Sequence, residues 1–130
     1  MLAKFGYLFL ALASLIQADA QTTSLEFPFQ FSEGLLWVQV HVSPSGQPLN
    51  FLLDSGASAS ILNLPAAEKL GVKLGKKLHI QGVNSTTIGY WSRNLSVTAG
   101  NISLPQDYVV VDLAKSSGLC EGRVDGLIGA

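Results

Sequence analysis

One segment of the chain decides how the rest of the sequence is interpreted. Residues 51–62 read FLLDSGASASIL, so Asp54 directly follows an apolar run and precedes Ser55 and Gly56. Aspartate, serine and glycine are common in turns for ordinary backbone reasons, so a simple turn is one interpretation. The apolar runs on both sides favour another, in which the turn and its carboxyl group are partly buried. A buried acid requires a partner or a chemical role.

The residues before this segment predict short β-strands. Leu35–Val42 places apolar residues at alternate positions, and residues 49–53 are apolar enough for a central strand. The turn residues 43–46 between them predict a hairpin with a loop of about five residues. Residues 25–31 also alternate, which predicts a half-buried strand, and Pro28 favours an edge position. The residues expected on its buried face are Leu25, Phe27, Phe29 and Phe31.

The residues after this segment predict one short helix and a further series of strands. Pro65 suits an early helical position over 65–70, Asn63 can cap its start, and Gly71 suits the residue just past its end. Glycine, asparagine and proline then separate apolar runs at regular intervals. These runs predict strands at 78–82, 86–90, 94–98, 101–104 and 108–111. The chain is therefore expected to be mostly β, with one or two short helices.

Composition excludes several classes of function. The chain has 130 residues, of which 48% are hydrophobic and only 13% charged, with a formal net charge of -1. Such a chain is too apolar to be disordered and lacks the basic field that nucleic-acid binding needs. The single cysteine cannot form an intramolecular disulfide or a thiolate metal site. The two histidines have no acid or cysteine neighbour at the spacing typical of metal ligands. We expect no metal, no cofactor and no nucleic-acid partner.

The first 20 residues have the pattern of a secretory signal peptide. Lys4 provides the positive start, residues 5–16 are apolar, and Ala18-Asp19-Ala20 is a small-x-small cleavage site. The apolar run is too short for a membrane span, although an uncleaved anchor is the alternative. We expect cleavage after Ala20, no membrane span in the mature chain, and an exported protein in the periplasm or outside the cell. Residues 21–32 then form an N-terminal strand or arm before a domain over 33–130.

A second segment completes the pattern near the end of the chain. Leu127 and Ile128 are followed by Gly129, and the acid before them, Asp125, fits a turn into this segment. Together with Asp54-Ser55-Gly56, the segment resembles the aspartic proteases of the pepsin and retropepsin superfamily, of the bacterial single-domain type. The resemblance implies a small closed β-barrel equivalent to half of a pepsin, in which Leu127, Ile128 and Gly129 support the active-site loop.

The resemblance also implies a mechanism. Two aspartates share one proton, since two carboxylates about 3 Å apart cannot both ionise. The ionised carboxylate takes a proton from water and the protonated one donates to the scissile carbonyl, which is general acid–base catalysis. Asp54 would be catalytic, Ser55 would hydrogen-bond to the opposite loop, and Gly56 would leave room for a peptide or protein substrate. No other aspartate is followed by Ser/Thr-Gly, so the expected active form is a homodimer with one Asp54 per protomer.

Three further expectations follow from the resemblance. A flap hairpin should cover the substrate, and its candidate residues are Gly82, Val83, Asn84 and Tyr90, although Tyr90 is equally interpreted as an ordinary strand aromatic. Family members continue beyond the second segment, so we expect the C-terminal end of the domain to be missing, unless residues 25–31 supply the interface strand. The alternative to an aspartic endopeptidase is an inactive peptide-binding or assembly module on the same fold.

Overall fold

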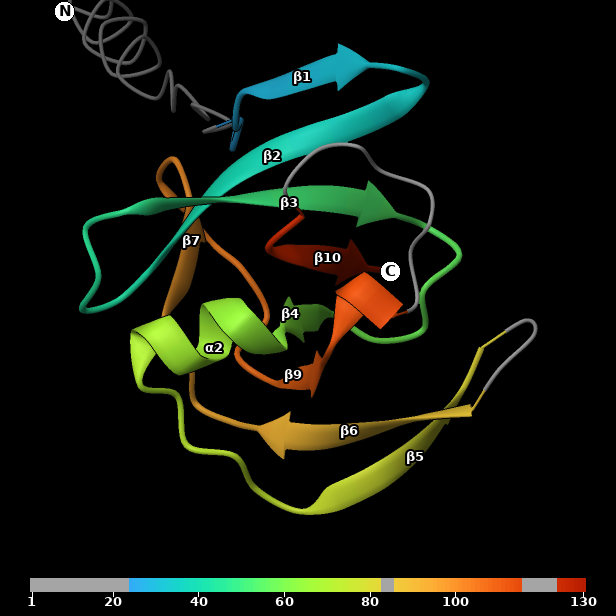
Figure 1. Cartoon of the computed structure of the whole chain (residues 1–130). Helices are drawn as coiled ribbons and strands as arrows, with labels where there is room; N and C mark the ends of the chain where they lie inside the picture. The colour runs from blue at the N-terminus through green and yellow to red at the C-terminus, as the bar shows by residue number, and fades with distance from the viewer. Residues whose placement is uncertain (1–23, 83–85, 116–123) are drawn as a thin grey trace, which may run out of the picture.

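The computed structural model describes residues 24–82, 86–115 and 124–130. The predicted signal peptide, the flap candidates Val83 and Asn84, and Cys120 lie outside these described residues. The described chain is mostly β with one short α-helix, as predicted (Figure 1). Among the described residues, no helix is both long and apolar enough to cross a membrane. The division into arm and domain stays a prediction.

Three strands lead to the Asp54 segment. They are β1 (Phe29–Ser32), β2 (Leu35–Val42) and β3 (Pro48–Asp54), each antiparallel to the next. The β2–β3 hairpin has the predicted five-residue loop between Val42 and Pro48. The tighter β1–β2 turn consists of Glu33 and Gly34, both with positive φ, as a two-residue turn matched to the twist of its strands requires.

The remaining elements include the predicted helix and strands with shifted bounds, together with the strands Ile61–Asn63 and Gly126–Gly129. They are β4 (Ile61–Asn63), α2 (Leu64–Leu70), β5 (Lys77–Gln81), β6 (Thr86–Ser92), β7 (Val97–Ala99), β8 (Ile102–Ser103), β9 (Tyr108–Val111), the 3-10 helix η1 (Leu113–Lys115) and β10 (Gly126–Gly129). α2 packs against β4 and β9 (Figure 1). Gly71 ends it in the left-handed conformation, with φ of 66°, as predicted.

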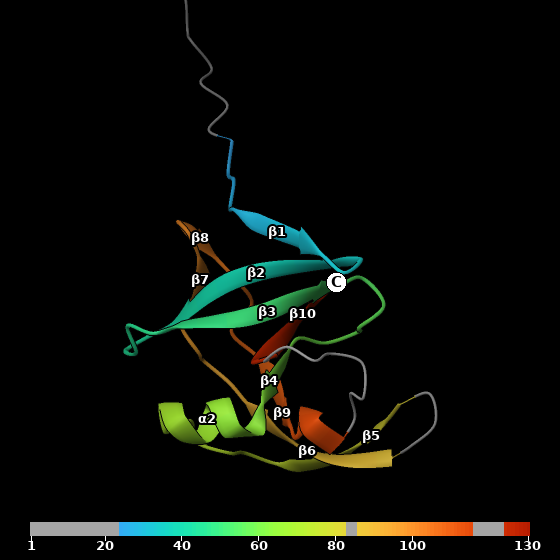
Figure 2. The same ribbon diagram turned by 45° about the horizontal axis from the view of Figure 1, so that its top comes forward.

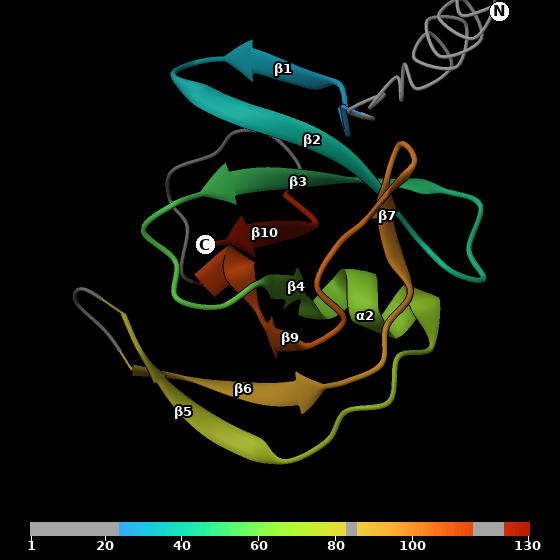
Figure 3. The ribbon, with the colours of Figure 1, turned by 180° about the vertical axis from the view of Figure 1, so that it is seen from behind.

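The strands form one sheet whose order is β5-β6-β9-β4-β10-β3-β2-β7-β8, with β1 pairing beside β2. The expected closed barrel is not observed: within the described residues the sheet stays open, because its terminal strands β5 and β8 each pair with one neighbour only. The β5–β6 hairpin extends away from the body, while β7 and β8 lie at the end opposite the tip of β3 (Figure 3).

The hydrophobic core lies between the folded layers of this sheet. β9 is buried along its whole length, since its neighbours β4 and β6 cover both edges and other elements cover both faces. Phe51 of β3 and Tyr108 of β9 meet edge to face in the core, with ring centroids 6.2 Å apart. Val38, Val40 and Val42 line the core side of β2, as the period of two predicts.

The N-terminal residues depart from the prediction. Only Phe27 packs against the core, whereas Leu25, Phe29 and Phe31 are 66%, 60% and 71% exposed. The strand begins at Phe29 and not at Leu25. β1 pairs only with β2, so it is an edge strand as predicted, but it extends beyond the body of the domain (Figure 2). No part of the described chain covers its apolar side chains.

Candidate active site

The Asp54 segment and the C-terminal segment lie side by side. β10 is inserted between β3 and β4, parallel to the first and antiparallel to the second. Its register pairs Gly129 with Asp54 and Ile128 with Leu53. Two strands that are consecutive in sequence are therefore separated by a third from the end of the chain. This arrangement holds the loop between β3 and β4 in place from both sides.

Close packing around Gly129 explains the glycine in the second segment. A Cβ atom there would lie 2.6 Å from the carbonyl oxygen of Ala59 and 2.7 Å from that of Ala57. The Gly129 amide donates a hydrogen bond of 3.2 Å to the Ser60 Oγ, and the Ala130 amide donates one of 3.1 Å to the Ala57 carbonyl. The loop therefore wraps around the end of β10, and a side chain at Gly129 would clash with backbone.

Asp54 stands at the tip of β3 with its carboxylate held by its own loop. Its Oδ1 accepts a hydrogen bond of 2.9 Å from the Gly56 amide, and its carbonyl accepts one of 3.2 Å from the Ala57 amide. Asp54, Ser55 and Gly56 are all exposed. The expectation that this turn is buried within one chain is therefore wrong: the apolar neighbours point into the core, but the loop itself projects beyond the sheet.

Ser55 has no hydrogen-bond partner among the described residues of its own chain. In the part of the chain that the structure describes, its exposed hydroxyl makes no hydrogen bond. The role implied for it by the resemblance, a bond to an opposite loop, requires a group from outside this chain. The structure thus places an aspartate and a serine at an exposed loop, where a second copy of the chain or a substrate could reach both.

Two of the other late aspartates, Asp112 and Asp125, serve the fold. Asp125 is buried, and its Oδ2 accepts a hydrogen bond of 2.9 Å from the Asn50 amide, while its own amide donates one of 2.8 Å to the Asn50 carbonyl. It links the start of β10 to β3 and is more than the turn residue that we predicted. Asp112 accepts a hydrogen bond of 3.1 Å from Ala114 at the start of η1. Neither carboxylate pairs with Asp54.

Asn63 has a different function from the predicted helix cap. It occupies the cap position of α2, but its side chain makes no cap hydrogen bond. Instead its Nδ2 donates to the Val124 carbonyl at 3.0 Å, and its Oδ1 accepts from the Leu113 amide at 3.1 Å. Asn63 and the buried Ser60 and Asp125 therefore fasten the strands around the Asp54 loop. The sequence indicated a helix cap at Asn63 and a turn at Asp125, and no local signal indicated these distant partners.

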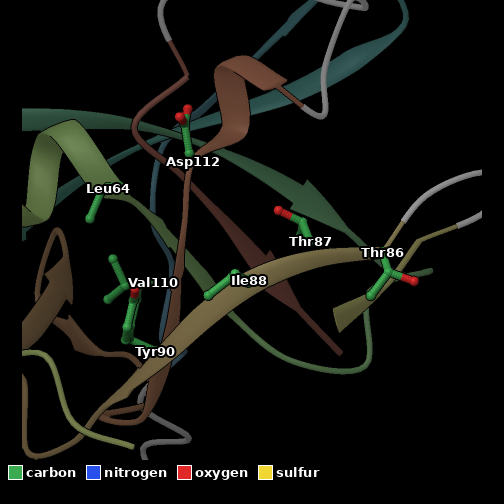
Figure 4. Close-up of a pocket in the computed structure, with 7 residues that line it drawn as sticks. All are labelled: Leu64, Thr86, Thr87, Ile88, Tyr90, Val110 and Asp112. Carbon is green, nitrogen blue, oxygen red and sulfur yellow. The ribbon is translucent and has the colours of Figure 1, made fainter. Parts of the chain in front are cut away.

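The predicted flap corresponds to the β5–β6 hairpin. Gly82 is exposed at the end of β5, while Tyr90 lies farther along β6, half-buried against the core and paired with Val110. Tyr90 thus has the setting of an ordinary strand aromatic. A pocket of about 400 Å³ lies beside β6, and Figure 4 shows the residues that line it. Its lining residues are Leu64, Thr86, Thr87, Ile88, Tyr90, Val110 and Asp112.

Comparison with known proteins identifies the family. The sequence matches the aspartyl protease family over residues 38–130, and the chain therefore belongs to that family. Its fold is similar to that of the retroviral protease-like domain of Ddi1 from Leishmania major, with a TM-score of 0.52 and 19% identity over 73% of this chain and 71% of that chain. The retropepsin-like fold inferred from the sequence is thus confirmed. No curated protein matches the chain.

Proposed function

We propose that the chain is an aspartic endopeptidase that acts as a homodimer, with one Asp54 from each protomer. The observation that supports this most directly is the pairing of Asp54 with Gly129, which sets the Asp-Ser-Gly loop beside the apolar-apolar-Gly segment. A simple turn would not require β10 to thread through its loop. The predicted signal peptide further suggests that the enzyme acts outside the cytoplasm.

The proposed chemistry needs two carboxyl groups in one cleft. With the two Asp54 side chains facing each other, the ionised one accepts a proton from water and the protonated one donates to the scissile carbonyl oxygen. The Gly56 amide that holds Asp54 Oδ1 fixes the orientation of the carboxylate. The β5–β6 hairpin closes over the peptide, and the pocket beside it offers space for a substrate side chain.

Substitution of Asp54 tests this proposal. Asp54→Asn should lower kcat against a quenched-fluorescence peptide library by about 10²–10⁴-fold, since the amide cannot act as the general base. Asp107→Asn is the matched control, because Asp107 is exposed in the loop before β9. Equal cleavage by wild type and Asp54→Asn would refute the assignment. Binding of peptides without cleavage by the wild type would support the inactive module instead.

A mixing experiment tests the requirement for two copies. Excess Asp54→Asn chain, added to a fixed amount of wild type, should lower activity as mixed dimers form, because each mixed dimer has one catalytic carboxyl group. Wild-type activity per molecule should also rise with protein concentration. Activity that is strictly proportional to concentration and insensitive to added Asp54→Asn chain would show that a single chain is sufficient.

A further inference from the structure

An apolar stripe extends from the Asp54 loop across three strands. We define the stripe as Phe29, Phe31, Leu36 and Leu53. Phe31 pairs with Leu36 in the β1–β2 ladder, and the β2–β3 register, in which Trp37 faces Leu52, places Leu36 beside Leu53. Directly paired residues share a face of a sheet. The stripe therefore lies on the face that forms the core farther along β2 and β3.

Exposure increases along this face toward β1. In the row next to Asp54, Ile128 is 7% exposed, Leu53 41% and Phe31 71%. In the next row, Phe51 and Val38 are buried while Phe29 is 60% exposed. The core face thus continues outward without cover from the described parts of the chain, and its uncovered part begins at the residue before Asp54. A contiguous exposed apolar surface of this kind marks an interaction site.

We infer that the stripe is where the second copy of the chain packs, an inference that rests on the proposed function. If two Asp54 carboxylates share a proton, the twofold axis passes within a few ångströms of each. Leu53 is one residue from Asp54, and Leu36 and Phe31 follow at strand spacings of about 4.8 Å. The partner must therefore cover the inner end of the stripe, and apolar side chains are what the core of such an interface uses.

The same geometry excludes pairing through the free edge of β1. Edge-to-edge pairing of two β1 strands would build a continuous sheet in which β2 and β1 of each copy separate the two β3 strands. Five strand spacings would then hold the Asp54 residues about 24 Å apart. Carboxyl groups at that distance cannot share a proton. The second copy must therefore pack against the face of the sheet that carries the stripe. The free edge of β1 then lies beside this contact and does not pair with the second copy.

Sedimentation of purified full chains tests the inference. Phe31→Asp should weaken dimerisation about tenfold or more, because it places a charge in the apolar contact. Leu74→Asp is the matched control, since Leu74 is also an exposed apolar residue, at 43%, but lies outside the stripe. It should dimerise like wild type. Phe31→Ser repeats the test with a milder change, and far-UV circular dichroism reports whether each variant folds.

The outcomes separate this inference from the proposed function. Asp54→Asn retains the stripe and should dimerise like wild type, whereas the double variant Asp54→Asn/Phe31→Asp should no longer lower wild-type activity when added in excess. A monomeric wild type, or dimerisation of both Phe31 variants at wild-type strength, would overturn the inference. A wild type that dimerises through the stripe without cleaving any peptide would refute the proposed function alone.

Discussion

Gly129 lies directly opposite Asp54 in the parallel ladder of β10 and β3, and the carbonyl oxygens of Ala57 and Ala59 fill the space where its side chain would be. The loop that carries Asp54 is thus closed around the backbone of the second segment. Because the obstructing atoms belong to backbone, they cannot move aside as the end of a flexible side chain could. The position of Asp54 therefore depends on the absence of a side chain at Gly129, which lies 75 residues farther along the chain.

We predict that Gly129→Ala lowers the free energy of unfolding by about 2–3 kcal/mol, which is the upper range for overpacking. Urea unfolding monitored by tryptophan fluorescence measures the change. Gly46→Ala is the control, because a Cβ at Gly46 meets no atom within 4 Å. Equal stability of the two variants would show that the loop yields to the added methyl group.

Asn63→Asp separates two roles of the same residue. Aspartate caps a helix as well as asparagine does, so a capping role predicts no loss of stability. The hydrogen bond from Nδ2 to the Val124 carbonyl needs a donor that aspartate lacks. We therefore predict that Asn63→Asp lowers the free energy of unfolding by about 1–3 kcal/mol. Asn101→Asp, at the exposed turn before β8, should change it by less than about 0.5 kcal/mol.

Asp125→Ala should destabilise the fold without any catalytic involvement of the acid. The substitution removes the carboxylate acceptor of the Asn50 amide at a part-buried contact. Loss of a hydrogen bond to a charged group predicts a decrease of about 2–3 kcal/mol in the free energy of unfolding. Chemical denaturation of Asp125→Ala beside Asp107→Ala, an exposed aspartate, measures it. If both variants unfold at the same denaturant concentration, Asp125 does not fasten β10 to β3.

Several strands were predictable because each of them reflects a local pattern. Leu35–Val42 and Tyr108–Val111 have the observed bounds, since alternation or a continuous apolar run is enough to identify a strand. The partners of Asn63 and Asp125 lie 50 to 75 residues away, and no local signal specifies them. The residue types indicated a helix cap for Asn63 and a turn for Asp125. In the fold, both side chains instead make hydrogen bonds to residues far away in the sequence.

The proximity of the two segments was predictable, whereas the exposure of the Asp54 loop was not. Asp54-Ser55-Gly56 and Leu127 to Gly129 were selected from sequence, and the structure brings them together. The sequence could not show that the loop is exposed in a single chain. Alternation at Phe29 and Phe31 likewise predicted a buried face, because a period of two does not distinguish packing on a core from packing on another molecule.

Tyr108 presents a buried hydroxyl group that the fold does not use. Its side chain is fully buried, and its hydroxyl has no hydrogen-bond partner among the described residues. Removing an unsatisfied polar group relieves its desolvation cost, so Tyr108→Phe should leave the free energy of unfolding unchanged or raise it by about 1 kcal/mol. Tyr108→Ala, which also removes the ring packed on Phe51, should lower it by about 3–5 kcal/mol. Thermal unfolding at neutral pH compares them.

The same hydroxyl predicts how stability changes in alkali. Burial raises the pKa of Tyr108 from 10.0 to about 12, so above pH 10 the unfolded chain releases this proton while the folded chain keeps it. The free energy of unfolding should therefore be fully retained below pH 10 and fall by about 3 kcal/mol between pH 10 and 12. Tyr108→Phe should not show this part of the decrease in the free energy of unfolding. Tyr90→Phe keeps the buried phenol of Tyr108 and should show it in full. Urea unfolding at each pH measures the difference, and parallel curves for wild type and Tyr108→Phe would contradict the prediction.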